Sequence, residues 1–178
     1  MAINVLTPIE TKYKGILFRS RIEARWALFF DKIKVPYEYE REGYKLDDST
    51  WYLPDFWMPQ QDFFIEIKGA APNLEEEIKA SVLAQQSGKS VFIFHGGIPT
   101  IEQYGSINFD PSAAAWRYSP DTTMSDGWIW AFYEGRPHLV KWADSREDNP
   151  LALYFLRHFN PVTDPLVYAY NAARSARF

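Results

Sequence analysis

Three charged residues lie in or beside segments that otherwise have the composition of buried β-strands. Glu66 and Lys68 belong to the run Phe63–Lys68, and Asp55 follows a shorter apolar run upstream. Alternate residues of a strand share one face, so Phe64, Glu66 and Lys68 project together, and Phe64 indicates that this face is covered. Burying a charge is unfavourable unless the group is paired or coordinated. The pattern therefore predicts a partner for these charges.

Two kinds of partner are compatible with the pattern. The first is an ion pair, in which Lys68 reaches solvent at the end of its strand. The second begins from Asp55, which closes the strand-like run Trp51–Leu53. An antiparallel hairpin with residues 58–62 as its connection would bring Asp55 to Glu66, with Lys68 beside them. Two hard oxygen ligands with positions left for water and phosphate describe a Mg²⁺ or Mn²⁺ site.

At Pro54-Asp55 and Glu66-Ile67-Lys68 the sequence resembles the PD-(D/E)XK nuclease superfamily, with Glu66 in the D/E position. The resemblance extends from about Phe18 to Gly96. It implies an α/β (α+β) protein with a restriction-endonuclease-like core, made of a helix, a three-stranded meander, a second helix and a further strand. It also implies a stand-alone nuclease of the type found in phages and other mobile elements.

The same resemblance implies a metal-dependent nuclease that hydrolyses phosphodiester bonds in DNA. Asp55, Glu66 and the backbone carbonyl of Ile67 would hold Mg²⁺ or Mn²⁺, and Glu23 on the first helix would add a third carboxylate. Lys68 would stabilise developing negative charge or orient the attacking water. The catalytic set is then Glu23, Asp55, Glu66 and Lys68. The alternatives are a non-catalytic nucleic-acid-binding module of the same fold and an RNA-directed nuclease.

Glu23 also has an ordinary structural explanation. Ser20 is a favourable N-cap for a helix over residues 21–33, and Glu23 stands where a capping box places its acidic residue. A metal-site role and a capping role both remain open for Glu23. The apolar residues of this helix recur at three- and four-residue spacing and predict its buried face, which consists of Ile22, Trp26, Phe29, Phe30 and Ile33.

The remaining core elements follow from alternation and capping signals. A buried parallel strand is expected at residues 90–95, because an almost continuous apolar run follows a helical crossover. The other expected elements are a strand at 36–41, a short strand at 44–46, and a helix at 74–86 capped by Asn73 and stopped by Gly88.

Two parts of one domain are expected, with residues 1–97 as the nuclease core and 98–178 as an extension packed on it. The extension reads as a loop-like segment at 98–126, a β-hairpin at about 127–142, a short helix near 151–158 and a terminal helix at about 165–177. The hairpin would either extend the central sheet or form a wing beside the substrate groove.

Composition limits the function further. The chain has 178 residues and no cysteine, which excludes disulfides and thiolate metal sites. Its formal net charge of −4 excludes a protein that coats DNA through overall positive charge. Basic groups can still act locally. Phosphate contacts are predicted for Arg19, Arg21, Arg25, Arg174 and Arg177, although arginine near a helix C-terminus is also ordinary capping electrostatics.

Aromatic residues make up 17% of the chain and seven are tryptophan, which suits either a well-filled core or a platform for stacked bases. The sequence has neither a signal-peptide pattern nor an apolar run of membrane-spanning length. We therefore expect a cytoplasmic protein of a bacterium or an infected host cell that has no membrane partner. Its oligomeric state, monomer or homodimer, is left open by the sequence.

Overall fold

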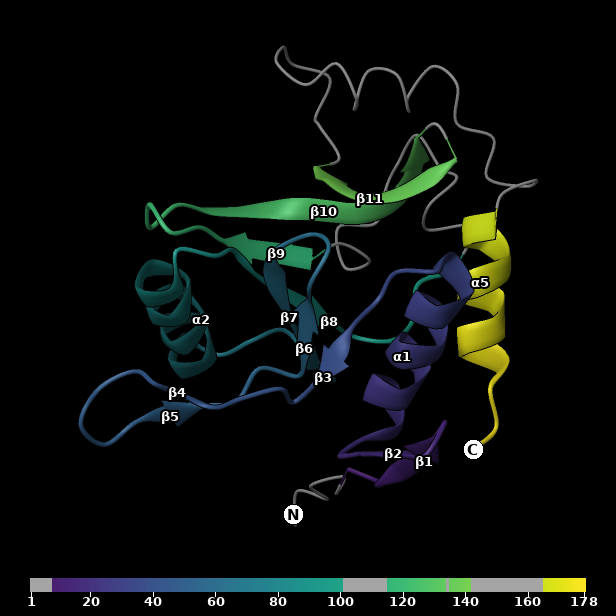
Figure 1. Ribbon diagram of the computed structural model, residues 1–178, viewed down its shortest axis with the longest axis horizontal. Coiled ribbons are helices and arrows are strands. Elements are labelled where there is room, and N and C mark those ends of the chain that lie inside the picture. Colours follow the sequence, from purple (N-terminus) through teal and green to yellow (C-terminus); the bar gives the residue numbers. More distant parts are fainter. Residues whose placement is uncertain (1–7, 101–114, 134, 142–164) are drawn as a thin grey trace, which may run out of the picture.

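The computed structural model describes residues 8–100, 115–133, 135–141 and 165–178. Over these residues the chain is a mixed α/β protein in which a seven-stranded sheet is accompanied by three helices and two small hairpins (Figure 1). This confirms the predicted α/β class, and the restriction-endonuclease-like core stays a prediction. None of the helices in the described ranges combines the length and the hydrophobicity needed to cross a membrane.

The strands of the large sheet are arranged in the order β11-β10-β9-β8-β7-β6-β3. The helices are α1 (Arg21–Ile33), α2 (Leu74–Ser87) and α5 (Pro165–Ser175). The strands are β1 (Thr11–Tyr13), β2 (Ile16–Phe18), β3 (Glu38–Tyr39), β4 (Tyr44–Lys45), β5 (Trp51–Tyr52), β6 (Phe56–Met58), β7 (Phe63–Lys68), β8 (Val91–His95), β9 (Ala115–Tyr118), β10 (Met124–Tyr133) and β11 (Arg136–Lys141).

The helix boundaries follow the capping signals in the sequence. The Ser20 side chain accepts the N–H of Glu23 at the start of α1, and Asn73 forms a complete capping box with Glu76 at the start of α2. Gly88 ends α2 in the left-handed conformation (φ 69°), which a residue without a Cβ adopts at little cost. The predicted spans 21–33 and 74–86 therefore match the observed helices closely.

The centre of the sheet combines antiparallel and parallel pairing. β3 pairs with β6 and β6 with β7 in antiparallel fashion, and β7 then pairs with β8 in parallel through the crossover helix α2. The parallel pairing predicted for residues 90–95 is thus confirmed. The separate β4–β5 hairpin is inserted between β3 and β6, and the Gln86 side chain of α2 donates a hydrogen bond to the Leu46 carbonyl beside it (2.8 Å).

One predicted strand pair is wrong. The partner of β7 is β6 (Phe56–Met58), whereas the predicted partner, Trp51–Leu53, contributes β5 and pairs with β4. Pro54 separates the two short runs, because proline has no N–H to donate to a ladder. The connection between β6 and β7 is a tight turn in which the Asp62 N–H bonds to the Met58 carbonyl (2.8 Å).

The C-terminal strands continue the same sheet. The hairpin β10–β11 extends it through β9, which decides between the two alternatives for this hairpin. β9 and the start of β10 fall within residues 98–126, which were expected to be a loop, because Pro and Ser/Thr residues beside these strands resemble loop composition. Gly127, at φ 78°, lies at the irregularity in the β9–β10 register. The predicted helix near 151–158 lies outside the described residues.

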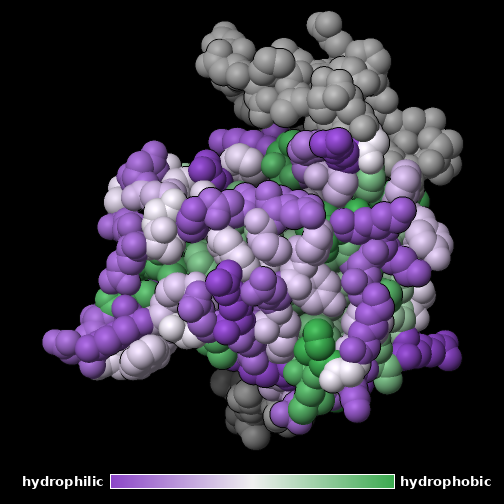
Figure 2. Space-filling view, in the orientation of Figure 1, coloured by the Kyte–Doolittle hydropathy of each residue, from purple (hydrophilic) through white to green (hydrophobic). Residues whose placement is uncertain are grey.

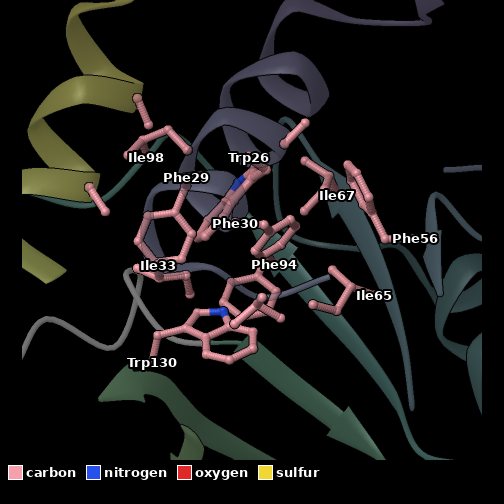
Figure 3. Packing of buried hydrophobic residues seen from close by; sticks show 14 of the residues in the cluster. Trp26, Phe29, Phe30, Ile33, Phe56, Ile65, Ile67, Phe94, Ile98 and Trp130 are labelled. Carbon is pink, nitrogen blue, oxygen red and sulfur yellow. The ribbon is translucent and has the colours of Figure 1, made fainter. Parts of the chain in front are cut away.

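The sheet is covered on both faces. Ile65 and Ile67 of β7 belong to a cluster with α1 and α5, whereas Phe64 belongs to a second cluster with Ala80 and Leu83 of α2. Figure 3 shows the first cluster, in which the large residues of α1 lie over the sheet and meet Trp130 of β10. Both faces of β7 are therefore buried, as the sequence indicates.

Phe30 is central to the first cluster and provides a test of it. The side chain is fully buried and its ring packs within 6 Å of the rings of Trp26, Phe56 and Trp130. Phe30→Ala is expected to lower the free energy of unfolding by about 3–5 kcal/mol, measured by urea denaturation, because it removes buried area and leaves a cavity.

Leu17→Ala is the matched control, because Leu17 is 57% exposed and its truncation is expected to change the free energy of unfolding by under about 0.5 kcal/mol. Equal losses in the two variants would contradict the assignment of Phe30 to the core.

Candidate functional site

Asp55 and Glu66 meet because of the register between β6 and β7. Phe56 lies opposite Ile65, so Asp55, one residue before β6, lies opposite Glu66. Opposite residues of an antiparallel pair project to the same face with Cβ atoms about 4.5–5.5 Å apart. The Asp55 N–H also donates a hydrogen bond to Glu66 Oε2 (3.3 Å). The structure thus brings together the two carboxylates that the sequence pairs.

A pocket of about 680 Å³ opens at this end of the strands. Its lining includes all four predicted catalytic residues, together with Arg19 and Ile67. Five carboxylates and three basic side chains line it, which gives a formal net charge of −2. The charged residues are Arg19, Glu23, Asp55, Glu66, Lys68, Glu75, Glu76 and Lys79. An excess of negative charge favours a cation in the pocket.

The Asp55 carboxylate is buried, with 2% of its surface exposed, and both of its oxygens have partners. Oδ1 accepts a hydrogen bond from Arg19 Nη2 at 2.6 Å, and Oδ2 accepts the Ile67 N–H at 2.7 Å. Burial and the nearby negative charges of Glu66 and Glu23 nevertheless raise the pKa of Asp55 well above its usual value. Its two donors therefore offset only part of the cost of placing this charge here.

Glu66 and Lys68 form an ion pair that includes a third residue. Lys68 Nζ lies 2.8 Å from Glu66 Oε1 and 3.1 Å from Glu76 Oε1, at the start of α2. Burial alone would lower the pKa of Lys68, but these carboxylates raise it above the usual value, so the ammonium stays charged. The ion pair expected as one alternative is present. Because Asp55 is buried beside it, the pair does not account for all the charge in the pocket.

Tyr52 is a further neighbour of Glu66, on the β4–β5 hairpin. Its hydroxyl is a hydrogen-bond partner of the Glu66 carboxylate, and burial with the charges of Glu66 and Asp55 raises its pKa well above the usual value. Tyr52 is therefore a neutral donor. It holds one carboxylate of the pair in place without adding charge to the pocket.

Glu23 lines the pocket but its carboxylate is engaged by local donors. Oε1 accepts the Ser20 hydroxyl and Oε2 accepts the Tyr39 hydroxyl, each at 2.5 Å. The Glu23 N–H donates to Ser20 Oγ at 3.3 Å, so the residue does contribute to the cap of α1. The capping role is thus confirmed, and the same side chain lines the pocket. Its role as a third metal ligand stays a prediction.

The donor set fits a hard divalent cation. Mg²⁺ is commonly held by one or two carboxylates together with water and substrate phosphate, and Asp55 with Glu66 supplies two. Within the described part of the chain, no group of three or more His, Cys, Asp or Glu side chains is arranged to hold a metal ion. Two carboxylates leave coordination positions for water and phosphate, as in an open cation site. Ile67 lines the pocket, where its N–H contacts Asp55, and its carbonyl remains a predicted ligand.

The arginines predicted to bind nucleic acid are not gathered at the pocket. Of the five, only Arg19 lines it, and there it pairs with Asp55 and Glu40. Arg25 donates a hydrogen bond to the Ala176 carbonyl (3.4 Å), whereas Arg21, Arg174 and Arg177 are exposed elsewhere. Phosphate contacts by these residues stay predictions.

Sequence reasoning missed three residues of the site in the roles they have here. Arg19 was expected to contact phosphate but binds Asp55, Glu76 was given no role beyond its place in a predicted helix, and Tyr52 was taken as part of a strand. A signal existed for Tyr52, which precedes Asp55 by three residues in an aromatic run. For Glu76 no local pattern distinguishes it from its neighbours Glu75 and Glu77.

Comparison of the chain with protein-family models, with curated proteins and with solved structures gives no match.

The raised pKa of Asp55 predicts a specific pH dependence of stability. Above the ordinary carboxyl pKa of about 3.9, the folded protein keeps a proton that the unfolded chain has released. The free energy of unfolding should therefore fall as the pH rises through this window, by up to about 1.4 kcal/mol per pH unit. We expect Asp55→Asn to remove this contribution in chelator-treated protein, measured by urea denaturation from pH 4 to pH 8.

Asp47→Asn is the control of opposite sign. Bonds from Ser49 and Thr50 lower the pKa of Asp47 to about 2, so its contribution is present above the ordinary carboxyl pKa and is lost as the pH falls below it. For this variant the denaturation series therefore extends down to about pH 2. Identical pH slopes for wild type and Asp55→Asn would show that Asp55 titrates normally.

Proposed function

We propose that the protein is a metal-dependent nuclease of the PD-(D/E)XK type that hydrolyses phosphodiester bonds in DNA. The observation that carries this proposal is the pair of buried carboxylates, Asp55 and Glu66, held opposite each other in an acidic pocket with a charged lysine, Lys68. The succession α1, meander β3–β6–β7, α2 and β8 supports a restriction-endonuclease-like core, to which β9–β11 and α5 form the extension.

Asp55 and Glu66 would hold Mg²⁺ or Mn²⁺, with the Ile67 carbonyl and Glu23 as the further predicted ligands. Bound there, the ion supplies Lewis-acid polarisation of the scissile phosphate and lowers the pKa of the attacking water. The electrostatics of the pocket support this assignment. Burial and the nearby charge of Glu66 raise the pKa of Asp55, and a divalent cation would relieve this repulsion as well as a proton does.

Lys68 would stabilise the negative charge that develops on the phosphate. Because its pKa is raised, the residue is a cation at neutral pH and cannot serve as a general base. A fixed cation aimed at developing charge is an effective electrostatic catalyst. Its contacts with Glu66 and Glu76 keep the ammonium at the pocket wall, beside the carboxylates.

Arg19 and Tyr52 act as positioning residues. Arg19 holds Asp55 Oδ1 while its Nε contacts Glu40, and the Tyr52 hydroxyl holds Glu66. Both side chains line the pocket. The Ile67 N–H fixes Asp55 from the strand itself.

The proposal is tested by cleavage of labelled single- and double-stranded DNA with Mg²⁺, Mn²⁺ or EDTA. We expect metal-dependent cleavage that Lys68→Ala lowers by about 100-fold or more, because a transition-state charge contact is lost. Lys89→Ala is the matched control, since Lys89 pairs with Asp62 at the opposite end of β7. The product ladder distinguishes endonucleolytic from exonucleolytic action.

Other outcomes select the alternatives. Intact DNA under every metal, followed by cleavage of RNA, would favour the RNA-directed nuclease. If both nucleic acids stayed intact but bound the protein, the non-catalytic binding module would replace the nuclease.

A second prediction concerns the cation without reference to activity. Mn²⁺ or Mg²⁺ should raise the thermal midpoint of the wild type, because a ligand at about 100 times its Kd adds about 2.7 kcal/mol to the folded state. Glu66→Gln should abolish this increase. Glu75→Gln should retain it, because Glu75 lines the same pocket but is 76% exposed and pairs with Lys79. An equal increase in all three proteins would place the cation elsewhere.

A further inference from the structure

A second hollow adjoins the carboxylate pocket, between the β4–β5 hairpin and α2. Its volume is about 950 Å³, and its apolar walls include Trp51 on the hairpin and Leu74, Ile78 and Val82 on the helix. Figure 2 shows hydrophobic surface between this hairpin and α2. We call it the hairpin groove.

Several exposed apolar side chains lie together in the hairpin groove, whereas in most folded proteins such residues are spread singly over the surface. Trp51 is 67% exposed, Leu74 72% and Ile78 53%. Nine large hydrophobic residues are exposed in the described part of the chain, and three of them line this one groove. Scattered exposed residues need no explanation, whereas a contiguous group marks a binding surface.

The hairpin groove is continuous with the candidate active site. Trp51, Glu75 and Lys79 line both hollows, so a ligand placed over Asp55 and Glu66 can extend past Trp51 without leaving the surface. Among the tryptophans whose burial the structure describes, Trp51 is the only one that is mainly exposed. An occupant must therefore suit both an aromatic face and the chemistry of the neighbouring pocket.

The charges of the groove favour an uncharged group. Its only basic residue, Lys79, is paired with Glu75 (2.6 Å), and Asp47 adds a further negative charge. A phosphate has no cationic partner here, whereas the flat face of a base can stack on an indole regardless of sequence. The Asp47 carboxylate accepts bonds from Ser49 and Thr50, which fixes the tip of the hairpin that carries Trp51.

We infer that the hairpin groove binds an unpaired nucleobase of the strand whose phosphate lies over Asp55 and Glu66, with the base stacked on Trp51. The inference rests on the proposed nuclease function and names its substrate class. In a duplex the faces of a base are covered by its neighbours, so stacking on Trp51 requires a single-stranded segment or an unpaired end.

The test measures binding by fluorescence anisotropy in the Lys68→Ala background with Mg²⁺, so that the nucleic acid stays intact. The probes are a single-stranded oligodeoxynucleotide, the matching duplex and an abasic strand of equal length. Trp51→Ala is expected to weaken single-strand binding about 10-fold, the loss of one base–aromatic stack, and to leave abasic binding unchanged. Trp51→Tyr should retain most of the affinity.

Tyr168→Ala is the matched control, because Tyr168 is an aromatic residue of similar exposure, 62%, on α5. Circular dichroism checks that each variant is folded. If Trp51→Ala does not fold, Ile78→Ser on the opposite wall of the groove replaces it, with the same selective loss expected.

The outcomes separate this inference from the proposed function. Single-strand affinity unchanged by Trp51→Ala, in a protein whose wild type cleaves DNA, overturns the base site alone and leaves the groove for a protein partner. Equal losses on single-stranded and abasic probes also overturn it, since they indicate a backbone contact. Selective loss without any cleavage by the wild type supports the base site but overturns the nuclease.

Discussion

The register between β6 and β7 is the constraint on which the candidate site depends. It places Asp55 opposite Glu66, and a slip of one residue would separate them and turn every side chain of one strand to the other face. Packing resists such a slip. Phe56 and Ile65 are buried against α1, whereas Phe64 is buried against α2 on the face that also carries Glu66 and Lys68. Inverting β7 would therefore place these two charges in the apolar cluster around α1. The position of the candidate site is thus determined by the hydrophobic core.

Within that register, the carboxylates are held in an electrostatically unfavourable arrangement. Arg19 and the Ile67 N–H bind Asp55, and Lys68 binds Glu66, yet the pKa of Asp55 remains raised. Removing one partner of a buried ion pair usually costs more stability than the intact pair provides. A cation in the pocket would offset part of this repulsion. The buried charge of Asp55 therefore lowers the stability of the fold, a cost that functional residues commonly carry.

How much the sequence predicts depends on the strength of the local signal. α1, β7, α2 and β8 are predicted well, because each combines a clear periodicity with a cap or a continuous apolar run. The partner of β7 is not, because Trp51–Leu53 and Phe56–Met58 are equally short and apolar and only pairing decides between them. β9 is missed for another reason, since this short strand lies beside Pro and Ser/Thr residues that resemble loop composition.

The site itself shows the same division between local and distant information. The capping role of Glu23 is visible from Ser20, three residues away, but its contact with Tyr39 depends on how β3 lies beside α1. Glu76 looks like an ordinary first-turn carboxylate until β7 brings Lys68 to it. Residue types identify which groups can do chemistry, whereas their partners, and hence their charge states, are decided by tertiary structure.

Burial distinguishes the tryptophans that fill the core from one that is available to a ligand. Their number alone is compatible with a filled core or with a base-stacking surface. Trp26 and Trp130 are buried in the aromatic cluster around α1, which explains them without reference to a ligand. Trp51 has no such explanation, since most of its surface faces solvent beside an acidic pocket. The fold alone implies no function. The proposed nucleic-acid substrate is therefore supported by an exposed indole that lies next to a buried pair of carboxylates.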